Sequence, residues 1–178
     1  MVYILLADGF EEIEALCPAD MLRRAGAEVK LVGMTGKTVT GAHGIKVDSD
    51  VTAKEVSGCT PDMLVLPGGQ PGTDNLDAQP ETHAMLRRVS DAGGFISAIC
   101  AAPKILGYSG YLCGKKATCF PGFDKYLIGA LKTDEKCVRD GNIITACAMG
   151  AAVRFGAELI AALCDRERAE KILAEIKA

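Results

Sequence analysis

The sequence predicts an α/β fold in which a mostly parallel sheet lies between layers of helices. Three observations predict it. Short apolar runs that favour strands alternate with longer segments of helical periodicity. The strand-like runs are apolar at almost every position, which is typical of strands buried on both faces. The 178 residues contain no internal repeat or low-complexity tract, and this length favours one domain over residues 1–178.

The first half of the chain supplies three strands, two helices and a hairpin. In chain order these are a strand at 2–7, a helix at 10–26, a strand at 28–34, a hairpin at 37–51, a strand at 62–69 and a helix at 79–93. Turn residues between short alternating runs indicate the hairpin. Pro80 near the start of the last helix and Gly93 near its end are typical helix boundaries.

The second half repeats the alternation of strands and helices. It contains a strand at 94–100, a helix at 101–110, a strand-like run at 115–120, a hairpin at 136–147 and two helices across 149–178. Right-handed crossovers place all strand-to-helix loops at one edge of a parallel sheet. Three of these loops, "ADGFEEIE", "LPGGQPG" and "AICAAP", carry distinctive residues. We therefore expect them to converge on a ligand site at the carboxyl ends of the strands.

The composition argues against several classes of protein. The formal net charge is −3, tryptophan is absent and aromatic residues make up 5%, so no nucleic-acid partner is expected. The most apolar long stretch, residues 143–164, is interrupted by Arg154 and Glu158 and indicates a buried helix, not a membrane span. No basic leader precedes Asp8, so we expect a cytoplasmic protein with eight reduced cysteines. Two histidines and no CxxC pair argue against a metal site.

Cys100 is singled out among the cysteines because it lies between a predicted strand and a predicted helix. Such a turn exposes a side chain above the sheet, as in the nucleophile elbows of hydrolases. The start of the following helix would supply N–H groups and a dipole that favour thiolate over thiol. The alternative is a small buried hydrophobic residue, which is what most free cysteines are. Position alone leaves both interpretations open.

Glu14 favours the first interpretation. It falls on a helix face that is otherwise apolar, formed by Ile13, Cys17, Met21 and Ala25. A carboxyl group in such a place should have a raised pKa, and if it meets Cys100 the two would share a proton. Glu11 and Glu12 are interpreted as solvated acids of the first helical turn. The alternatives are that Glu14 reaches water at the edge of the face, or that Asp20 is the important polar residue there.

The segments "GFEEIEALCPADMLRRAG", "LVLPGG" and "AICAAP" together resemble the ThiJ/PfpI superfamily, and within it the deglycase-like branch. The similarity runs over essentially the whole chain. It implies a flavodoxin-like three-layer sandwich, a homodimer, and no metal or organic cofactor. It also implies that Cys100 is the nucleophile, with a protonated Glu14 as its hydrogen-bond partner. The backbone N–H groups of Gly69 and Ala101 would then bind the oxyanion.

Three departures from the family pattern affect the expected chemistry. The histidine that often stands near the cysteine in a "HP" step is replaced here by Phe120. Ala101 stands where peptidase-like members carry a histidine, so a Cys-His peptidase is not expected. The "SRGPGT"-type segment is matched only loosely by "ACAMGA", which loses its polar contacts. We expect Gly68, Phe120 and His43 to line the site, with His43 at a position from which the family can reach a neighbouring subunit.

The expected function is that of a cofactor-independent glyoxalase or deglycase. Its substrates would be reactive aldehydes such as methylglyoxal, or their glycated adducts. The Cys100 thiolate would attack the aldehyde and Glu14 would move protons during the rearrangement to a hydroxy acid. The alternative is a sensor of oxidative stress or a chaperone without turnover, in which Glu14 stabilises Cys100 after its oxidation to sulfinate.

Overall fold

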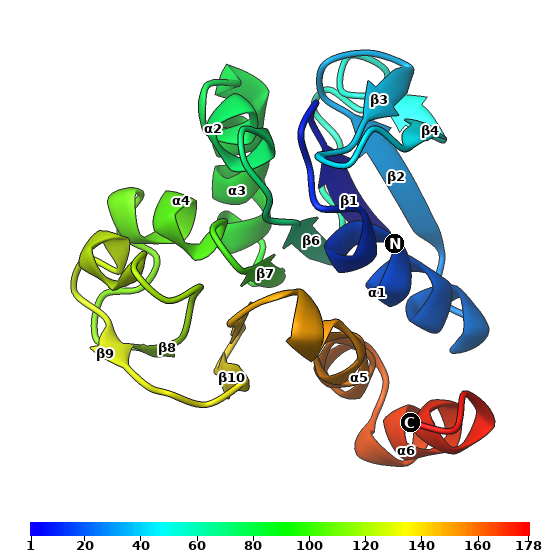
Figure 1. Cartoon of the computed structure of the whole chain (residues 1–178), viewed down its shortest axis with the longest axis vertical. Helices are drawn as coiled ribbons and strands as arrows, with labels where there is room; N and C mark the ends of the chain where they lie inside the picture. Colours follow the sequence, from blue (N-terminus) through cyan, green and yellow to red (C-terminus); the bar gives the residue numbers. More distant parts are fainter.

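A seven-stranded sheet forms the centre of the computed structural model, which describes residues 1–178 (Figure 1). Its strands lie in the order β10-β11-β7-β6-β1-β2-β5. They are β1 (Val2–Leu6), β2 (Val29–Gly33), β5 (Val51–Thr52), β6 (Met63–Leu66), β7 (Phe95–Ile99), β10 (Cys137–Asp140) and β11 (Ile143–Ala146). All neighbouring strands run parallel except β10, which is antiparallel to β11. The predicted mostly parallel sheet is confirmed.

Helices cover both faces of this sheet (Figure 1). One face carries α1 (Glu12–Arg24), α5 (Ala152–Leu163) and α6 (Arg166–Glu175). The other carries α2 (Gly72–Asp77), α3 (Pro80–Asp91) and α4 (Pro103–Tyr108). Each face has its own hydrophobic core of buried side chains, so the three-layer sandwich is confirmed.

The position of β1 inside the sheet explains why apolar and polar residues do not alternate in its sequence. Successive side chains of a strand point to opposite faces. Ile4 and Leu6 accordingly enter the core beneath α1 and α5, whereas Tyr3 and Leu5 enter the core beneath α3 and α4. Because both faces of β1 are covered by helices, a polar residue at any of these positions would be buried.

The shorter elements agree with the prediction in part. The expected hairpin is formed by β3 (Thr38–Thr40) and β4 (Lys46–Asp48), which pair antiparallel. The run at 115–120 is only a two-residue strand, β8 (Lys116–Ala117), paired parallel with β9 (Leu131–Lys132). Helix α2 was not predicted. Two 3₁₀ turns complete the chain, η1 (Asp124–Tyr126) and η2 (Met149–Ala151).

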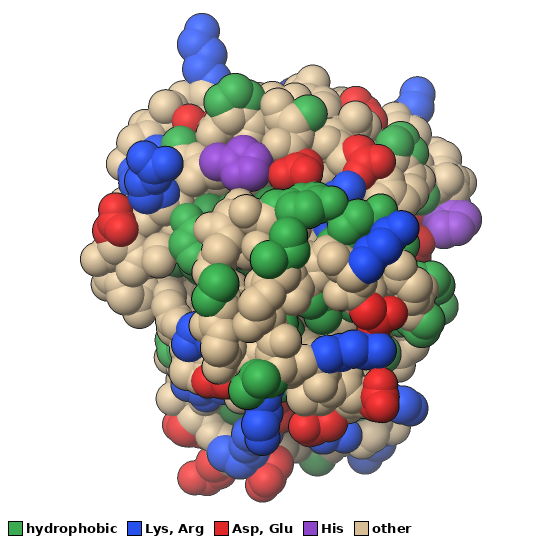
Figure 2. Space-filling model, turned by 90° about the vertical axis from the view of Figure 1, so that its left-hand side faces the viewer, with side chains coloured by type: hydrophobic (Ala, Val, Ile, Leu, Met, Phe, Trp, Pro, Cys, Tyr) green, Lys and Arg blue, Asp and Glu red, His purple; other side chains and the backbone are tan.

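The surface carries charges of both signs. Figure 2 shows one face, on which Lys and Arg side chains are interspersed with Asp and Glu, and hydrophobic side chains gather near its middle. None of the helices has the length and apolar character needed to cross a membrane.

Candidate active site

The three distinctive loops meet where the strand order reverses. β2 and β5 lie on one side of β1, and β6, β7 and β11 lie on the other. Open parallel sheets bind ligands at such a reversal. The Glu11 N–H donates to the Gly68 carbonyl (2.9 Å), and the Gly72 N–H donates to the Gly9 carbonyl (3.1 Å). A Cβ placed on Gly68 would lie 2.6 Å from the Cβ of Cys100. The predicted convergence of the loops is confirmed.

Cys100 occupies a strained turn directly after β7. Its φ is 64°, a left-handed conformation that costs a non-glycine residue about 1–2 kcal/mol. Two backbone bonds hold it there. The Cys100 N–H donates to the Ala146 carbonyl (2.9 Å), and the Cys100 carbonyl accepts from the Phe120 N–H (2.8 Å). The predicted elbow between strand and helix is therefore present, and it leaves the thiol half-buried.

Glu14 is completely buried beside this thiol. Its Oε2 atom accepts the N–H of Gly68 (3.0 Å), and its carboxyl group also shares a hydrogen bond with Cys100. The other oxygen, Oε1, is buried with no partner. Burial raises the pKa of Glu14 to about 7 against the hydrogen bonds from Cys100 and Gly68, which lower it. At neutral pH the carboxyl group is therefore partly protonated, as predicted from its place in the sequence.

The thiol pKa moves in the direction opposite to the prediction. Burial and then the charge of Glu14 raise the pKa of Cys100 to about 12, while hydrogen bonds from the N–H groups of Gly69 and Ala101 lower it. Helix α4 begins only at Pro103 and is six residues long, so its dipole does not compensate. Above about pH 7, where Glu14 has ionised, Cys100 and Glu14 retain one proton between them. The thiolate forms when that proton resides on Glu14.

The buried carboxyl group predicts a pH dependence of stability. Between pH 4.5 and about 7 the folded protein keeps a proton on Glu14 that the unfolded chain has lost. The free energy of unfolding should therefore fall as pH rises through this window, by up to about 3 kcal/mol. Urea unfolding at pH 5 and pH 7.5 measures the change in wild type and in Glu14→Gln, which lacks the titrating group. An equal pH dependence in both proteins would contradict the assignment.

Two glycines allow the loop after β6 to approach Glu14 and Cys100. Gly68 leaves no room for a side chain, because an added Cβ would lie 2.6 Å from Glu14 Oε2. Gly69 has a φ of +88°, and its Cβ would lie 2.5 Å from the Glu11 nitrogen. The backbone N–H groups of this loop reach the carboxyl group and the sulfur for that reason.

The substitution Gly69→Ala should destabilise the fold by about 2–4 kcal/mol, because the backbone strain adds to a steric clash. Gly93 is a matched control, since it has a φ of +72° and no atom within 4 Å of an added Cβ. Gly93→Ala should therefore cost only the backbone strain, about 1–2 kcal/mol. Urea unfolding of the two variants separates the cost of the steric clash from the cost of backbone strain. Equal losses of unfolding free energy would show that the close contact at Gly69 is relieved without cost.

A small cavity opens above the thiol. Its volume is about 140 Å³, and it is lined by Gly69, Gln70, Cys100, Ala101, Phe120 and Phe123. Phe120 therefore lines the site as expected, and no histidine does. Gln70 and Phe123 were not predicted. The Phe120 and Phe123 rings pack edge to face with centroids 6.4 Å apart. Their spacing of three residues in the sequence is the feature that could have indicated that Phe123 accompanies Phe120 in the site.

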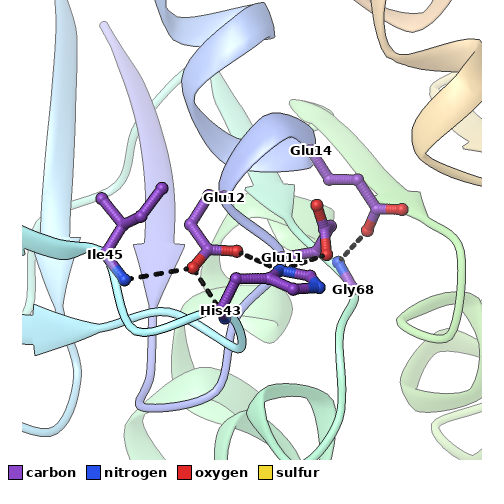
Figure 3. A network of polar contacts seen from close by, with 6 residues as sticks. All are labelled: Glu11, Glu12, Glu14, His43, Ile45 and Gly68. Atoms are coloured by element: carbon purple, nitrogen blue, oxygen red, sulfur yellow. Dashed lines mark hydrogen bonds and ion pairs between the residues drawn. The ribbon is translucent and has the colours of Figure 1, made fainter.

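His43 lies outside the cavity and binds a different acid. Its backbone N–H donates to Glu12 Oε1 and its Nδ1 lies 2.8 Å from Glu12 Oε2. Figure 3 shows Glu12 turned toward His43 and Ile45, while Glu14 turns toward Gly68. Glu12 is only 3% exposed, so its interpretation as a solvated acid was wrong. The carboxylate ties the hairpin to α1, which the local helical pattern does not reveal.

Glu11, Glu12 and His43 are the residues that come nearest to a metal site. One ligand atom from each lies within 4.8 Å of the others. The Glu12 oxygens already accept the N–H groups of His43 and Ile45, and Nδ1 of His43 is bound to the same carboxylate. The cluster is thus accounted for by its own hydrogen bonds.

The apolar face predicted for α1 also needs correction. Ile13 is 50% exposed and does not flank a buried stripe, although Met21 and Ala25 are buried. Glu14 is buried because the loop at Gly68 covers it from the sheet side. The raised pKa was thus predicted correctly from an incorrect set of neighbours.

Curated proteins of known name are similar to this chain over most of its length. Protein dj-1beta of Drosophila melanogaster is 33% identical over 172 residues, which cover 95% of this chain and 92% of that protein. Deglycase PH1704 of Pyrococcus horikoshii is 33% identical over 146 residues, covering 81% and 87%. Glutathione-independent glyoxalase DJR-1.2 of Caenorhabditis elegans is 31% identical over 172 residues, covering 96% and 91%.

Solved structures agree with the sequence comparison. A cysteine-to-alanine mutant of a DJ-1 superfamily protein from Salmonella typhimurium superposes with a TM-score of 0.94 at 33% identity, covering 99% of this chain and 97% of that one. Oxidized Toxoplasma gondii DJ-1 has the same TM-score and identity and covers 98% and 96%. The flavodoxin-like fold is confirmed. The sequence also matches the profile of the DJ-1/PfpI family over residues 1–162, and the chain belongs to that family.

Proposed function

We propose that this protein is a cysteine-dependent, cofactor-independent glyoxalase or deglycase that acts on small reactive aldehydes or their adducts. One observation carries the proposal: the completely buried carboxyl group of Glu14 lies beside the strained, half-buried Cys100, which lines a small cavity. The cavity of about 140 Å³ is smaller than the roughly 300–1,000 Å³ of sites for drug-sized ligands. This size favours a substrate of a few carbon atoms, or the small adduct at the end of a larger one.

The reaction begins when the shared proton resides on Glu14. The Cys100 thiolate attacks the aldehyde carbon of methylglyoxal, a C–S bond forms, and the carbonyl electron pair moves to oxygen. The N–H groups of Gly69 and Ala101, which already reach the sulfur, stabilise this oxyanion. Glu14 then donates its proton to the oxygen and gives a hemithioacetal.

Glu14 also serves the rearrangement. As a carboxylate it removes the hydrogen from the carbon bonded to sulfur, and the resulting enediol is reprotonated on the neighbouring carbon. The product is a thioester of lactate with Cys100. Water hydrolyses the C–S bond, lactate and one proton leave to solvent, and the thiol and carboxyl group again hold one proton.

The proposal is tested with purified protein and methylglyoxal in the absence of glutathione. Lactate should accumulate in step with the loss of aldehyde, as followed by proton NMR. Cys164→Ser is the matched control, because Cys164 is an exposed cysteine outside the site and its loss should leave the rate unchanged. The absence of lactate above the level of the protein-free reaction would refute the activity.

Oxidation of Cys100 is a second candidate function. It is favoured by the buried Oε1 of Glu14, which has no partner beside the thiol and would gain one when a sulfinic oxygen is formed. Intact-mass analysis after limited peroxide treatment tests it. Oxidation confined to Cys100, as sulfinate (a gain of about 32 Da) or as a product of its sulfenic acid, supports it if the product disappears in Cys100→Ala. Oxidation spread evenly over the thiols contradicts it.

We further infer that the chain forms a homodimer through the region around Glu12. Ile13 and Ile45 adjoin this buried acid and are 50% and 54% exposed, which is costly for two large apolar side chains. Burial of both against a second copy would remove that cost. Sedimentation equilibrium should give twice the chain mass, and a monomer at micromolar concentration would contradict the inference.

A further inference from the structure

A second cysteine lies opposite Cys100 on the neighbouring strand. β7 and β11 run parallel with Ile99 opposite Ala146 as the last pair, and Cys100 and Cys147 directly follow the two strand ends. The ladder continues through this step, because the Cys100 N–H donates to the Ala146 carbonyl (2.9 Å). The same kind of bond occurs at the start of the strand pair, where the Ile96 N–H donates to the Asn142 carbonyl (2.9 Å). Asn142 directly precedes Ile143, the residue opposite Ile96. The last bond of the ladder therefore places the Cys100 and Cys147 backbones side by side, with Cys100 (φ 64°) already in the turn after β7.

Register places the two backbones within reach of a disulfide. Neighbouring strands lie about 4.8 Å apart, and disulfides join Cα atoms about 4.4–6.8 Å apart. Both cysteines are half-buried, and both pack against the core beneath α1 and α5. Cys119, also close in space, belongs to the core on the opposite face of the sheet and is buried. Cys147 is therefore the favoured partner of Cys100.

Cys147 also has room to move. It lines a cavity of about 390 Å³ together with Phe120, which also lines the cavity above Cys100. Its backbone is held by a bond from the Cys147 N–H to the Lys136 carbonyl (3.0 Å), so a rotation about χ1 changes only the position of the sulfur. The open cavity gives a reductant access to the same sulfur.

We propose that Cys147 is the resolving thiol of Cys100 and that the two form a reversible disulfide after oxidation by a hydroperoxide. The proposal rests on the reactivity of Cys100 assumed in the proposed function. It adds a modification site to that function, because the disulfide would protect Cys100 from irreversible oxidation to sulfinate and would switch off aldehyde turnover until it is reduced.

The chemistry proceeds in two steps. The Cys100 thiolate attacks hydrogen peroxide, an S–O bond forms while the O–O bond breaks, and the second oxygen leaves as hydroxide that takes up a proton to become water. Cys100 is oxidised by two electrons to sulfenic acid, and the peroxide is reduced. The Cys147 sulfur then attacks the Cys100 sulfur. The S–S bond forms, the S–O bond breaks, and hydroxide leaves as water with the thiol proton of Cys147.

The test treats reduced protein with two equivalents of hydrogen peroxide, enough for sulfinate, and follows it by intact mass and non-reducing tryptic mapping. Wild type should lose about 2 Da and give a cross-link between the peptides of Cys100 and Cys147. Cys147→Ser should give no cross-link and should gain about 32 Da on Cys100 instead. Cys119→Ser is the matched control and should behave as wild type. Reduced Cys147→Ser should convert methylglyoxal at the wild-type rate.

Three outcomes would overturn the proposal. These are sulfinate formation in wild type to the extent seen in Cys147→Ser, a cross-link to Cys119 in place of Cys147, and persistence of the disulfide in Cys100→Ser. The failure of the proposed function is distinguishable from these. A wild-type protein that forms the disulfide but makes no lactate retains the redox pair without the glyoxalase activity, and lactate without a disulfide shows the reverse.

Discussion

Replacing Cys100 with serine is expected to lower the rate of methylglyoxal conversion by at least about a thousand-fold. The reason is the acidity of the attacking group. A serine hydroxyl is less acidic than even the buried thiol of Cys100, and an uncharged hydroxyl is a much weaker nucleophile than sulfur, so Glu14 activates serine to a far smaller extent. Serine should keep the elbow intact, because the turn is held by the backbone bonds to Ala146 and Phe120 and not by the sulfur.

The measurement is the initial rate of lactate formation, with circular dichroism and urea unfolding to show that the variant is folded. Cys59→Ser serves as the matched control, since Cys59 is exposed and precedes β6, whereas the site residues Gly68 and Gly69 follow the other end of that strand. A folded Cys100→Ser protein with more than a few per cent of the wild-type rate would show that the sulfur is not the nucleophile.

Glu14→Gln is expected to have the second large effect, a loss of about 10²–10⁴-fold in turnover. The amide can still accept the Gly68 N–H through its oxygen, so the loop keeps its place. It cannot donate and remove a proton in successive steps. At the same time the thiol should become more acidic, because the Glu14 charge that raises the pKa of Cys100 is gone. Alkylation of Cys100 by iodoacetamide at pH 7 should therefore become faster while turnover falls.

This opposite response distinguishes proton transfer from a structural defect, which would slow turnover without increasing the acidity of the thiol. Asp20→Asn provides the control on the same helix, since Asp20 is exposed and pairs with Arg24. Parallel decreases in alkylation and turnover in Glu14→Gln would contradict the role of Glu14 as the partner that exchanges a proton with Cys100.

The parts of the structure that follow from local patterns could be predicted. Continuous apolar runs identified β1, β6 and β7 as strands buried on both faces. The elbow at Cys100 followed from an apolar strand that passes directly into a proline-containing helix start. The meeting of three loops followed from the handedness of the crossovers, which is a general property of parallel sheets.

The parts that depend on contacts distant in sequence could not be predicted. Glu12 is buried because the hairpin folds over α1 and presents the N–H groups of His43 and Ile45, which lie 31 and 33 residues away in the chain. Ile13 is exposed for the same reason, since the helix turns Glu12 inward. The pKa of the Cys100 thiol is raised and not lowered because burial and Glu14 outweigh the backbone N–H groups. This balance depends on the three-dimensional structure and could not be predicted from the sequence.

The solitary Oε1 atom of Glu14 has a consequence for the choice of ligand. Above pH 7 the carboxyl group is ionised, and this oxygen is a buried acceptor that receives no hydrogen bond. Because Glu14 is completely buried and does not line the cavity, the missing donor, worth about 1–3 kcal/mol, has to come from a group bonded to the neighbouring Cys100 sulfur. Among covalent adducts of Cys100, those that carry a hydroxyl group next to sulfur should therefore be favoured over aprotic ones of equal size, and more strongly in alkaline solution.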